Sequence, residues 1–222
     1  MNAPVRMSCS TILFDLDGVL VDSAECVERT WHRWAVEHDL DPARVIEIAH
    51  GRRTIETVQT AAPHLAAAEE AAALEAGQSN TTDGVYEVPG ARELLQRLPE
   101  NAWGIVTSGT RALASARIQH TGIPMPRVLV CADEIQRGKL DPEGYLVAAE
   151  RLGKAPAECV VIEDAPTGIE AARAAGMRAI AVSGTYSADA LAMADFTIPY
   201  LRALNISTPG NGSPLEITVA VD

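Results

Sequence analysis

Short apolar runs alternate along the chain with amphipathic segments. The apolar runs are of strand length and rich in Val and Ile: TILF, WGIVT, RVLV, CVVI, RAIAV and FTI. Most are followed by a segment with helical periodicity, namely PGARELLQRL, TRALASARIQH, DPEGYLVAAERL or PTGIEAARAAG. Continuous apolar strands separated by helices predict a parallel sheet that helices cover on both faces. The predicted fold class is therefore α/β, with a Rossmann-like parallel sheet as the core.

The pattern changes after the first strand. Residues 22–85 show helical periodicity in SAECVERTWHRWAVEHD, DPARVIEIAHG, TIETVQTAA and the alanine-rich run that follows, without a convincing strand. This predicts a small all-helical cap inserted after the first strand. The predicted domains are a core at 1–21 and 86–205, a cap at 22–85 and a tail at 206–222. The turn-rich tail ends in a strand-like alternation, which fits either an edge strand or a loose tail.

Composition and charge narrow the class of partner. At 222 residues the chain is long enough for one large domain or for a core with a smaller insertion. Its net charge of -12 argues against nucleic acid or an anionic membrane as the main partner. A small anionic substrate stays possible, because it responds to the local field. The four scattered cysteines form no CxxC pair, and no run is long enough to cross a bilayer. We therefore expect a cytoplasmic protein with reduced thiols; its oligomeric state stays open.

Polar residues follow several of the predicted strands at the point where each strand ends. In a doubly wound sheet, ligands bind outside the carboxyl ends of the strands. Asp15 and Asp17 follow TILF, Thr107, Ser108 and Gly109 follow WGIV, Glu163 and Asp164 follow CVVI, and Lys139 lies in a loop before a helix. The sheet should therefore gather four acids, a hydroxyl group and a lysine at one edge.

Such a set of residues has a chemical logic. Converging carboxylates cannot all ionise without a cation, and hard oxygen ligands suit Mg²⁺. The Ser108 hydroxyl group and backbone N–H groups at a helix N-terminus can bind phosphate, while Lys139 neutralises charge. A cation would also shield one carboxylate so that it can attack phosphorus. Each fragment alone could be a turn, a helix cap or a surface lysine, but their occurrence together, in order and at strand ends, favours catalysis.

These residues resemble the four motifs of the haloacid dehalogenase-like hydrolases. FDLDGVLVDS is similar to the first motif, TSG to the second, Lys139 to the third and IEDAPTGIEAARAAGM to the fourth. The resemblance implies that Asp15 is the nucleophile and that Asp17 is the general acid, which later acts as the base for water. It implies that Ser108 and Lys139 hold the phosphoryl group, with Gly109 beside Ser108 in the substrate site.

The same resemblance implies a metal site and a reaction class. Asp164 and Glu163 would join Asp15 and the backbone carbonyl of Asp17 around Mg²⁺. Dehalogenases of the family lack the second aspartate, whose presence as Asp17 favours phosphoryl transfer, where a leaving oxygen must be protonated.

The predicted cap helps to separate the possible phosphoryl-transfer reactions. The helical insert is similar to the cap of the family's sugar phosphatases and phosphomutases. Phosphomutases of that group carry a histidine at the position of Val27, and phosphonate-cleaving members use a cap lysine, which 23–77 does not contain. Simple hydrolysis is the reaction that remains.

The segment HGRRTIETV resembles the cap of phosphatases that act on glycerol phosphate and 2-deoxyglucose 6-phosphate. His50, Arg52, Arg53 and Glu56 are therefore candidates for contacts with the hydroxyl end of the substrate. The alternative is that these residues only stabilise the end of a helix. Cap closure would hinge near Val21–Ser23 and Gly84–Val88.

One position departs from the family pattern. The family usually continues its lysine motif with proline, but Leu140 follows Lys139 here. Proline would restrict the backbone, so we expect Leu140 to relax this loop and to leave Lys139 less pre-positioned.

The sequence thus predicts a Mg²⁺-dependent phosphatase that hydrolyses a small phosphorylated sugar or polyol, of the hexose, hexitol or glycerol phosphate class, through an aspartyl-phosphate at Asp15. One alternative is a sugar phosphomutase of the same group. The other is a non-catalytic regulator that binds phosphate.

Overall fold

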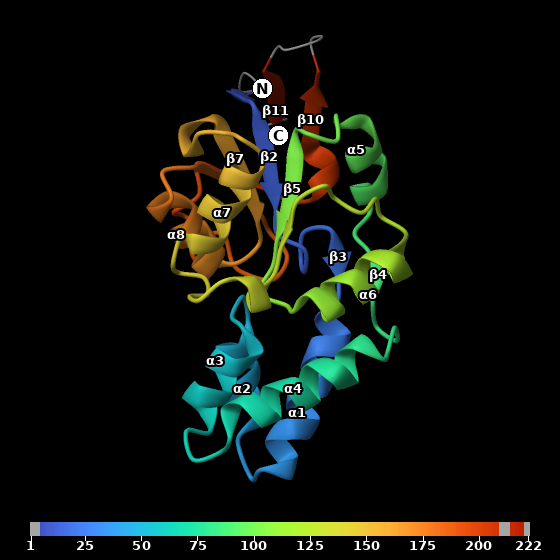
Figure 1. The fold of residues 1–222 in the computed structure, drawn as a ribbon, viewed down its shortest axis with the longest axis vertical. Helices are drawn as coiled ribbons and strands as arrows, with labels where there is room; N and C mark the ends of the chain where they lie inside the picture. Colours follow the sequence, from blue (N-terminus) through green and yellow to red (C-terminus); the bar gives the residue numbers. More distant parts are fainter. Residues whose placement is uncertain (1–4, 209–213, 220–222) are drawn as a thin grey trace.

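A parallel sheet forms the centre of the computed structural model, which describes residues 5–208 and 214–219 (Figure 1). In spatial order its six strands are β6 (Leu129–Val130), β5 (Trp103–Val106), β2 (Thr11–Phe14), β7 (Cys159–Glu163), β8 (Arg178–Val182) and β9 (Phe196–Ile198). All five pairings between them are parallel. The predicted α/β class is confirmed, and each predicted apolar run supplies one strand.

The strand order reverses beside β2. The chain adds β5 and β6 on one side of β2, and then β7, β8 and β9 on the other. This is the Rossmann-like order, in which the crevice between the first and fourth strands of the sheet accepts ligands. Here those strands are β2 and β7, which run side by side with Phe14 opposite Ile162.

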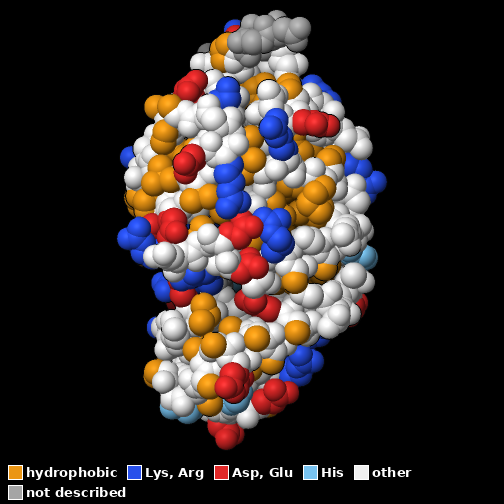
Figure 2. All heavy atoms as spheres, viewed as in Figure 1, with side chains coloured by type: hydrophobic (Ala, Val, Ile, Leu, Met, Phe, Trp, Pro, Cys, Tyr) orange, Lys and Arg blue, Asp and Glu red, His pale blue; other side chains and the backbone are white. Residues whose placement is uncertain are grey.

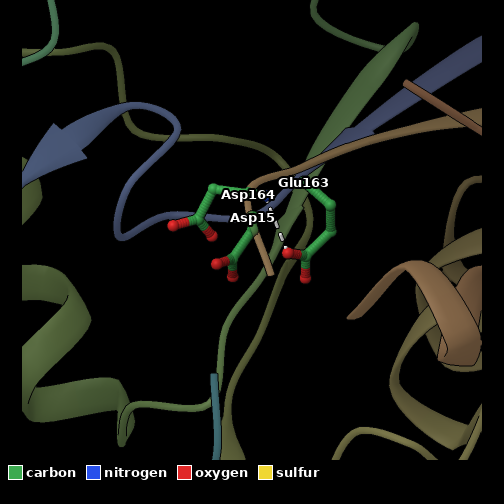
Figure 3. Close-up of side chains that lie close together, drawn as sticks. All are labelled: Asp15, Glu163 and Asp164. Carbon is green, nitrogen blue, oxygen red and sulfur yellow. Dashed lines mark hydrogen bonds between the residues drawn. The ribbon is translucent and has the colours of Figure 1, made fainter. Parts of the chain in front are cut away.

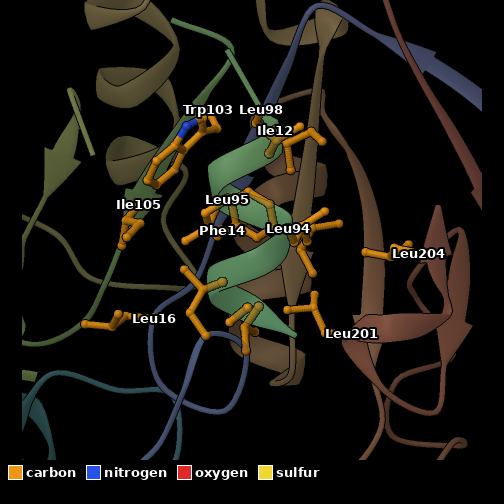
Figure 4. Close-up of a cluster of buried hydrophobic side chains, with 14 of the residues drawn as sticks. Ile12, Phe14, Leu16, Leu94, Leu95, Leu98, Trp103, Ile105, Leu201 and Leu204 are labelled. Carbon is orange, nitrogen blue, oxygen red and sulfur yellow. The ribbon is translucent and has the colours of Figure 1, made fainter. Parts of the chain in front are cut away.

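Helices cover both faces of this sheet because alternate residues of a strand point to opposite sides. Ile12 and Phe14 of β2 belong to a buried cluster with α5 (Ala91–Arg97) and α6 (Arg111–Thr121). Figure 4 shows how α5 fits its leucines against them. Leu13, between them, points into a second cluster with α7 (Glu143–Arg151) and α8 (Pro166–Ala174). Short 3-10 helices occur at Ala132–Glu134 (η1), Pro156–Glu158 (η2) and Leu201–Ala203 (η3).

A second, antiparallel sheet joins the two ends of the chain. Strand β11 (Leu215–Val219) pairs with β1 (Val5–Cys9) on one side and with β10 (Leu204–Ser207) on the other. The alternation near the end of the sequence does form a strand, but the sequence did not predict β1, because its partner comes from the opposite end of the chain. Of the predicted tail, residues 209–213 and 220–222 lie outside the described part, as do residues 1–4 of the predicted core.

Four helices form a separate unit at the lower end of Figure 1, which we call the helical unit. They are α1 (Ala24–Glu37), α2 (Pro42–Ala49), α3 (Thr54–Ala61) and α4 (Ala67–Ser79). Their own buried cluster includes Trp31 and Trp34, whose rings meet edge to face at 5.4 Å. Where the chain enters and leaves this unit, β3 (Val21–Asp22) pairs antiparallel with β4 (Tyr86–Glu87), a ribbon too short to predict from the sequence.

None of the helices within the described ranges combines the length and the apolar character needed to span a bilayer. On the face drawn in Figure 2, acidic and basic side chains are interspersed rather than separated into fields of one sign. All four cysteines are free and buried.

The packing of Phe14 generates a stability prediction. Its fully buried ring meets Trp103 edge to face, so Phe14→Ala should lower the free energy of unfolding by about 3 to 5 kcal/mol. Denaturant unfolding followed by circular dichroism would measure the change. As a control, Val36→Ala at a side chain that is 57% exposed should change it by less than about 0.5 kcal/mol. Equal changes in both variants would contradict the assigned core.

Candidate active site

Three carboxylates meet where β2 and β7 end. Asp15 directly follows β2, and its backbone N–H still donates to the carbonyl of Ile162 on β7, at 2.9 Å. Glu163 is the last residue of β7, and Asp164 follows it. One oxygen from each of Asp15, Glu163 and Asp164 lies within 4.8 Å of the others. Figure 3 shows the three side chains side by side at the strand ends. The parallel register thus makes an acidic cluster out of residues far apart in the sequence.

Lys139 supplies positive charge to this cluster. Its ammonium group donates to Asp15 Oδ1 at 2.7 Å and also to Glu163 Oε1. The Lys139 side chain is only 6% exposed. Lys139 therefore contacts both acids with Leu140 as its neighbour; the expected relaxation of this loop stays a prediction.

Glu163 accepts hydrogen bonds on both of its oxygens. Oε1 accepts from Lys139 and from the hydroxyl group of Tyr145, the latter at 2.9 Å, and Oε2 accepts from the backbone N–H groups of Asp164 and Ala165, each at 3.0 Å. Four donors match the roughly four lone-pair sites of a carboxylate. The sequence did not predict a role for Tyr145, because an aromatic residue on an amphipathic helix usually packs in the hydrophobic core.

Burial controls the charge state of the acids. Desolvation raises the pKa of Asp15 well above its usual value, and the pull of Lys139 in the opposite direction only partly offsets it, because Glu163 and Asp164 repel a further negative charge. Desolvation followed by repulsion from Glu163 raises the pKa of Asp164 to about 7, although Thr185 donates a hydrogen bond to it at 2.6 Å. Lys139 keeps its charge, since its pKa is raised by Asp15 and Glu163 despite burial. Acids held partly protonated in this way fit a site that a cation completes.

The side chain of Asp17 lies apart from the three clustered acids. Its Oδ1 atom accepts from Ser23 Oγ at 2.7 Å and pairs with Arg117 Nη1 at 2.6 Å. Gly18 directly follows Asp17 with φ +81, and a Cβ there would stand 2.0 Å from Asp164 Oδ2. Only glycine fits this turn, because of its positive φ and its close approach to Asp164.

Ser108 and Gly109 follow β5, as predicted. The Ser108 hydroxyl group donates to the carbonyl of Gly51 at 3.1 Å, and Gly109 N–H donates to the Thr107 hydroxyl group at 3.1 Å. Gly51 belongs to the segment between α2 and α3. The loop predicted to bind phosphate therefore touches the helical unit directly.

A cleft of about 820 Å³ lies between the helical unit and the parallel sheet. From the core, Asp15, Asp17, Ser108, Gly109 and Asp164 line it, and from the helical unit His50 and Arg52 do. This brings two of the four predicted cap residues to the same cleft as the predicted nucleophile. Arg117, Gln78, Thr185 and Tyr186 also line the cleft, and sequence reasoning missed them, because only the fold places them there.

The other two predicted cap residues lie elsewhere. Arg53 and Glu56 form an ion pair with each other. Glu56 also accepts from Gly138 N–H at 3.3 Å, next to Lys139, and Arg53 lines a small recess beside Lys139 and Ser108. In this arrangement they contact the lysine loop and not the large cleft; their contact with a substrate stays a prediction.

Fold and site together define an α/β protein whose acidic centre lies at the point where the strand order reverses, facing a helical unit across a cleft. The sequence model of one protein family, the haloacid dehalogenase-like hydrolases, matches residues 9–176 of this chain. The chain belongs to this family, which confirms the predicted resemblance.

Several proteins that are similar in sequence to this chain are phosphatases. It is 40% identical over 211 residues to hexitol phosphatase A of Escherichia coli strain K12, covering 93% of this chain and 98% of that protein. It is 34% identical to glycerol-1-phosphate phosphohydrolase 2 of Saccharomyces cerevisiae, covering 85% of this chain and 80% of the relative. It is 32% identical to 2-deoxyglucose-6-phosphate phosphatase 1 of the same yeast, and the match covers 90% of this chain and 92% of that protein.

Solved structures share the fold. That of CbbY from Rhodobacter sphaeroides in complex with phosphate has a TM-score of 0.76 at 22% identity, covering 86% of this chain and 94% of that one. The structure of β-phosphoglucomutase from Clostridium difficile has a TM-score of 0.72 at 24% identity, and the match covers 86% of this chain and 91% of that one.

The raised pKa of Asp164 generates a prediction for cation binding. Because a cation needs the ionised carboxylates, its affinity should fall as the pH drops below about 7, where Asp164 takes up a proton. The fall should approach tenfold per pH unit for each proton displaced. Calorimetric titration with Mg²⁺ in two buffers of different ionisation enthalpy would measure both affinity and proton release. Affinity and proton release that do not change with pH would contradict the assigned charge states.

Proposed function

We propose that this protein is a phosphomonoesterase that hydrolyses small phosphorylated sugars or polyols through an aspartyl-phosphate intermediate at Asp15. The observation that carries the proposal is the contact of the buried ammonium group of Lys139 with Asp15, which lines the same cleft as Asp17 and Ser108. The phosphatases that match the chain over most of its length support the same substrate class.

In the first step, an Asp15 carboxylate oxygen attacks the phosphorus atom of the substrate. A bond forms between that oxygen and phosphorus, and the bond from phosphorus to the sugar oxygen breaks, with its electron pair going to the leaving oxygen. Lys139 and the Ser108 hydroxyl group hold the phosphoryl oxygens, with the Gly109 backbone beside them. Ser108 would exchange its bond to Gly51 for one to the substrate.

Asp17 moves the protons. Its carboxylic acid form gives a proton to the leaving oxygen in the first step, and the resulting carboxylate then takes a proton from the attacking water in the second. That water forms a new bond to phosphorus while the bond to Asp15 breaks, so the free carboxylate of Asp15 is restored. Asp17 fits this role because it lines the cleft without belonging to the acidic cluster.

The acidic cluster is the proposed site for Mg²⁺. Asp15, Asp164 and Glu163 with the backbone carbonyl of Asp17 would hold the ion, which would supply positive charge to the phosphoryl group and reduce its repulsion by Asp15. Hard oxygen donors within 4.8 Å of one another fit such an ion. Both oxygens of Glu163 already accept hydrogen bonds, so we assign it mainly to holding Lys139.

The helical unit is the proposed cap. We assign 1–21 and 86–205 to the catalytic core and 22–85 to the cap, with hinges near Val21–Ser23 and Gly84–Val88 where β3 and β4 pair. His50 and Arg52 would meet the hydroxyl end of the substrate in the cleft. The Arg53–Glu56 pair belongs to the proposed cap and contacts the lysine loop at Gly138, so a movement of the cap would change this contact.

The two alternatives make different demands on the site. Sugar phosphomutases of the group typically carry a histidine at the position of Val27, and here a valine lines the cleft at that position. A regulator that only binds phosphate would not need Asp17 to be poised in the cleft.

Phosphate release from a panel of substrates tests the function. We expect release that depends on Mg²⁺ from hexitol, glycerol, hexose, pentose and 2-deoxyglucose phosphates, with a clear ranking among them. Asp15→Asn should reduce phosphate release to the level of a reaction without enzyme. Interconversion of sugar phosphates without release would indicate a mutase, and binding of phosphate mimics without either reaction would indicate a regulator.

A pair of variants separates the roles of two neighbouring acids. Asp164→Asn should weaken Mg²⁺ binding strongly because it removes a charged ligand. Glu163→Gln should instead lower kcat by about 10- to 100-fold, with a smaller effect on Mg²⁺ affinity, because it loosens Lys139. Calorimetry and steady-state kinetics on both proteins would compare these losses. A larger loss of Mg²⁺ affinity in Glu163→Gln than in Asp164→Asn would show that Glu163 is the stronger ligand.

A further inference from the structure

The carboxylate of Asp17 is held by one of its two oxygens. Ser23 and Arg117 both bind Oδ1, at 2.7 and 2.6 Å. Among residues 5–208 and 214–219, no group donates a hydrogen bond to Oδ2. Since Asp17 lines the cleft, one oxygen is anchored while the other can meet a ligand.

Arg117 is buried beside the cleft and makes one ion pair and one hydrogen bond. It lies on α6, is only 6% exposed, and follows the core residue Ala114 by one turn. Nη1 binds Asp17, and Nη2 donates to the side-chain oxygen of Gln78 at 2.7 Å. Burying a guanidinium group is costly unless it is paired. Because the guanidinium group is planar and rigid, its hydrogen bond to Gln78 restricts where Nη1 can lie beside Asp17.

Gln78 connects this pair to the helical unit. It is a buried residue near the end of α4, which packs against α6 across the boundary with the core. Ser23, the other partner of Asp17, stands at the N-cap of α1, where the chain enters the same unit. Both residues that position the Asp17 carboxylate are therefore tied to the helical unit, from opposite ends of its sequence.

We propose that Arg117 is the residue that positions Asp17 for proton transfer, and that its bond to Gln78 makes this position depend on the placement of the helical unit. The inference rests on the proposed function. When the helical unit is seated, Asp17 Oδ1 is fixed and Oδ2 presents its proton to the leaving oxygen as the bond to phosphorus breaks. When the unit moves away, Gln78 releases the guanidinium group and Asp17 loses this alignment. Proton transfer is thereby reserved for the closed cleft, from which bulk water is excluded.

Arg117 could instead bind an anionic group of the substrate, since it also lines the cleft. Its two terminal nitrogens are engaged with Asp17 and Gln78, however, and its Nε atom is buried without a hydrogen-bond partner in the described structure. Substrate binding and positioning of Asp17 predict different kinetics. A lost substrate contact raises KM, whereas a lost alignment of the general acid lowers kcat.

The leaving group provides the decisive test. An alkoxide needs a proton to leave, whereas p-nitrophenolate leaves readily without one, so only alkyl phosphates depend fully on Asp17. Arg117→Met keeps the side-chain length and removes the charged fork. It should lower kcat about 100-fold for the alkyl phosphate that ranks highest in the panel, with little change in KM, and lower kcat less than about tenfold for p-nitrophenyl phosphate. Arg117→Lys should recover part of the loss.

Controls separate this effect from damage to the fold. Arg151→Met, which removes an arginine that is 42% exposed on α7 and paired with Glu134, should leave the ratio of the two rates unchanged. Thermal unfolding of each variant would confirm that it is folded. An equal fall with both substrates in a folded Arg117→Met protein, or a rise in KM alone, would overturn the inference while leaving the proposed function intact. A wild-type protein that releases phosphate from neither substrate would overturn both.

The role of Gln78 is tested by a double-mutant cycle. Gln78→Leu should lower kcat for the alkyl phosphate more than for p-nitrophenyl phosphate, in the same sense as Arg117→Met. Adding it to Arg117→Met should cause no further loss, because the two residues act on Asp17 through one chain of contacts. Losses that multiply in the double variant would show that Gln78 acts independently of Arg117, and the proposed link to the helical unit would be wrong.

Discussion

The buried ammonium group of Lys139 lies between the carboxylates of Asp15 and Glu163, and the geometry of the site depends on this group of three charges. Glu163 is fully buried, so its charge is tolerable only because four donors surround it. Fixing Glu163 in this way also fixes Lys139, and Lys139 in turn fixes the Asp15 oxygen to which it donates. One buried carboxylate therefore determines how the predicted nucleophile is presented to the cleft.

The parallel sheet makes this arrangement possible. Neighbouring strands β2 and β7 end at the same level, so Asp15 and Glu163 meet although most of the chain lies between them. The strand order reverses at the same place, which leaves a crevice that no helix fills. Close packing leaves no freedom there: a Cβ on Gly168 would stand 1.6 Å from Glu163 Oε1, so the first turn of α8 must contain glycine next to this side chain. The backbone is thus shaped around the charges.

The helical unit touches several of the residues that would perform the chemistry. Ser108 bonds to Gly51 of the helical unit, and Lys139 follows Gly138, whose N–H bonds to Glu56. Contacts of this kind connect the placement of the helical unit with the phosphate loop and the lysine loop at once. A site built across two parts of the chain can be assembled only when both parts are in place, which suits a reaction that must exclude water until substrate is bound.

The sequence alone determined the alternation of strands and helices, the helical insertion and the set of polar residues at the strand ends. These features are local, because apolar periodicity and the residue that follows a strand are written in consecutive positions. Only the tertiary structure decided that β1 pairs with β11, that Tyr145 and Arg117 hold acids of the site, and that Arg53 and Glu56 contact the lysine loop while Arg52 faces the cleft. Those contacts join residues distant in sequence, and their side-chain directions depend on how helices pack, which periodicity does not specify.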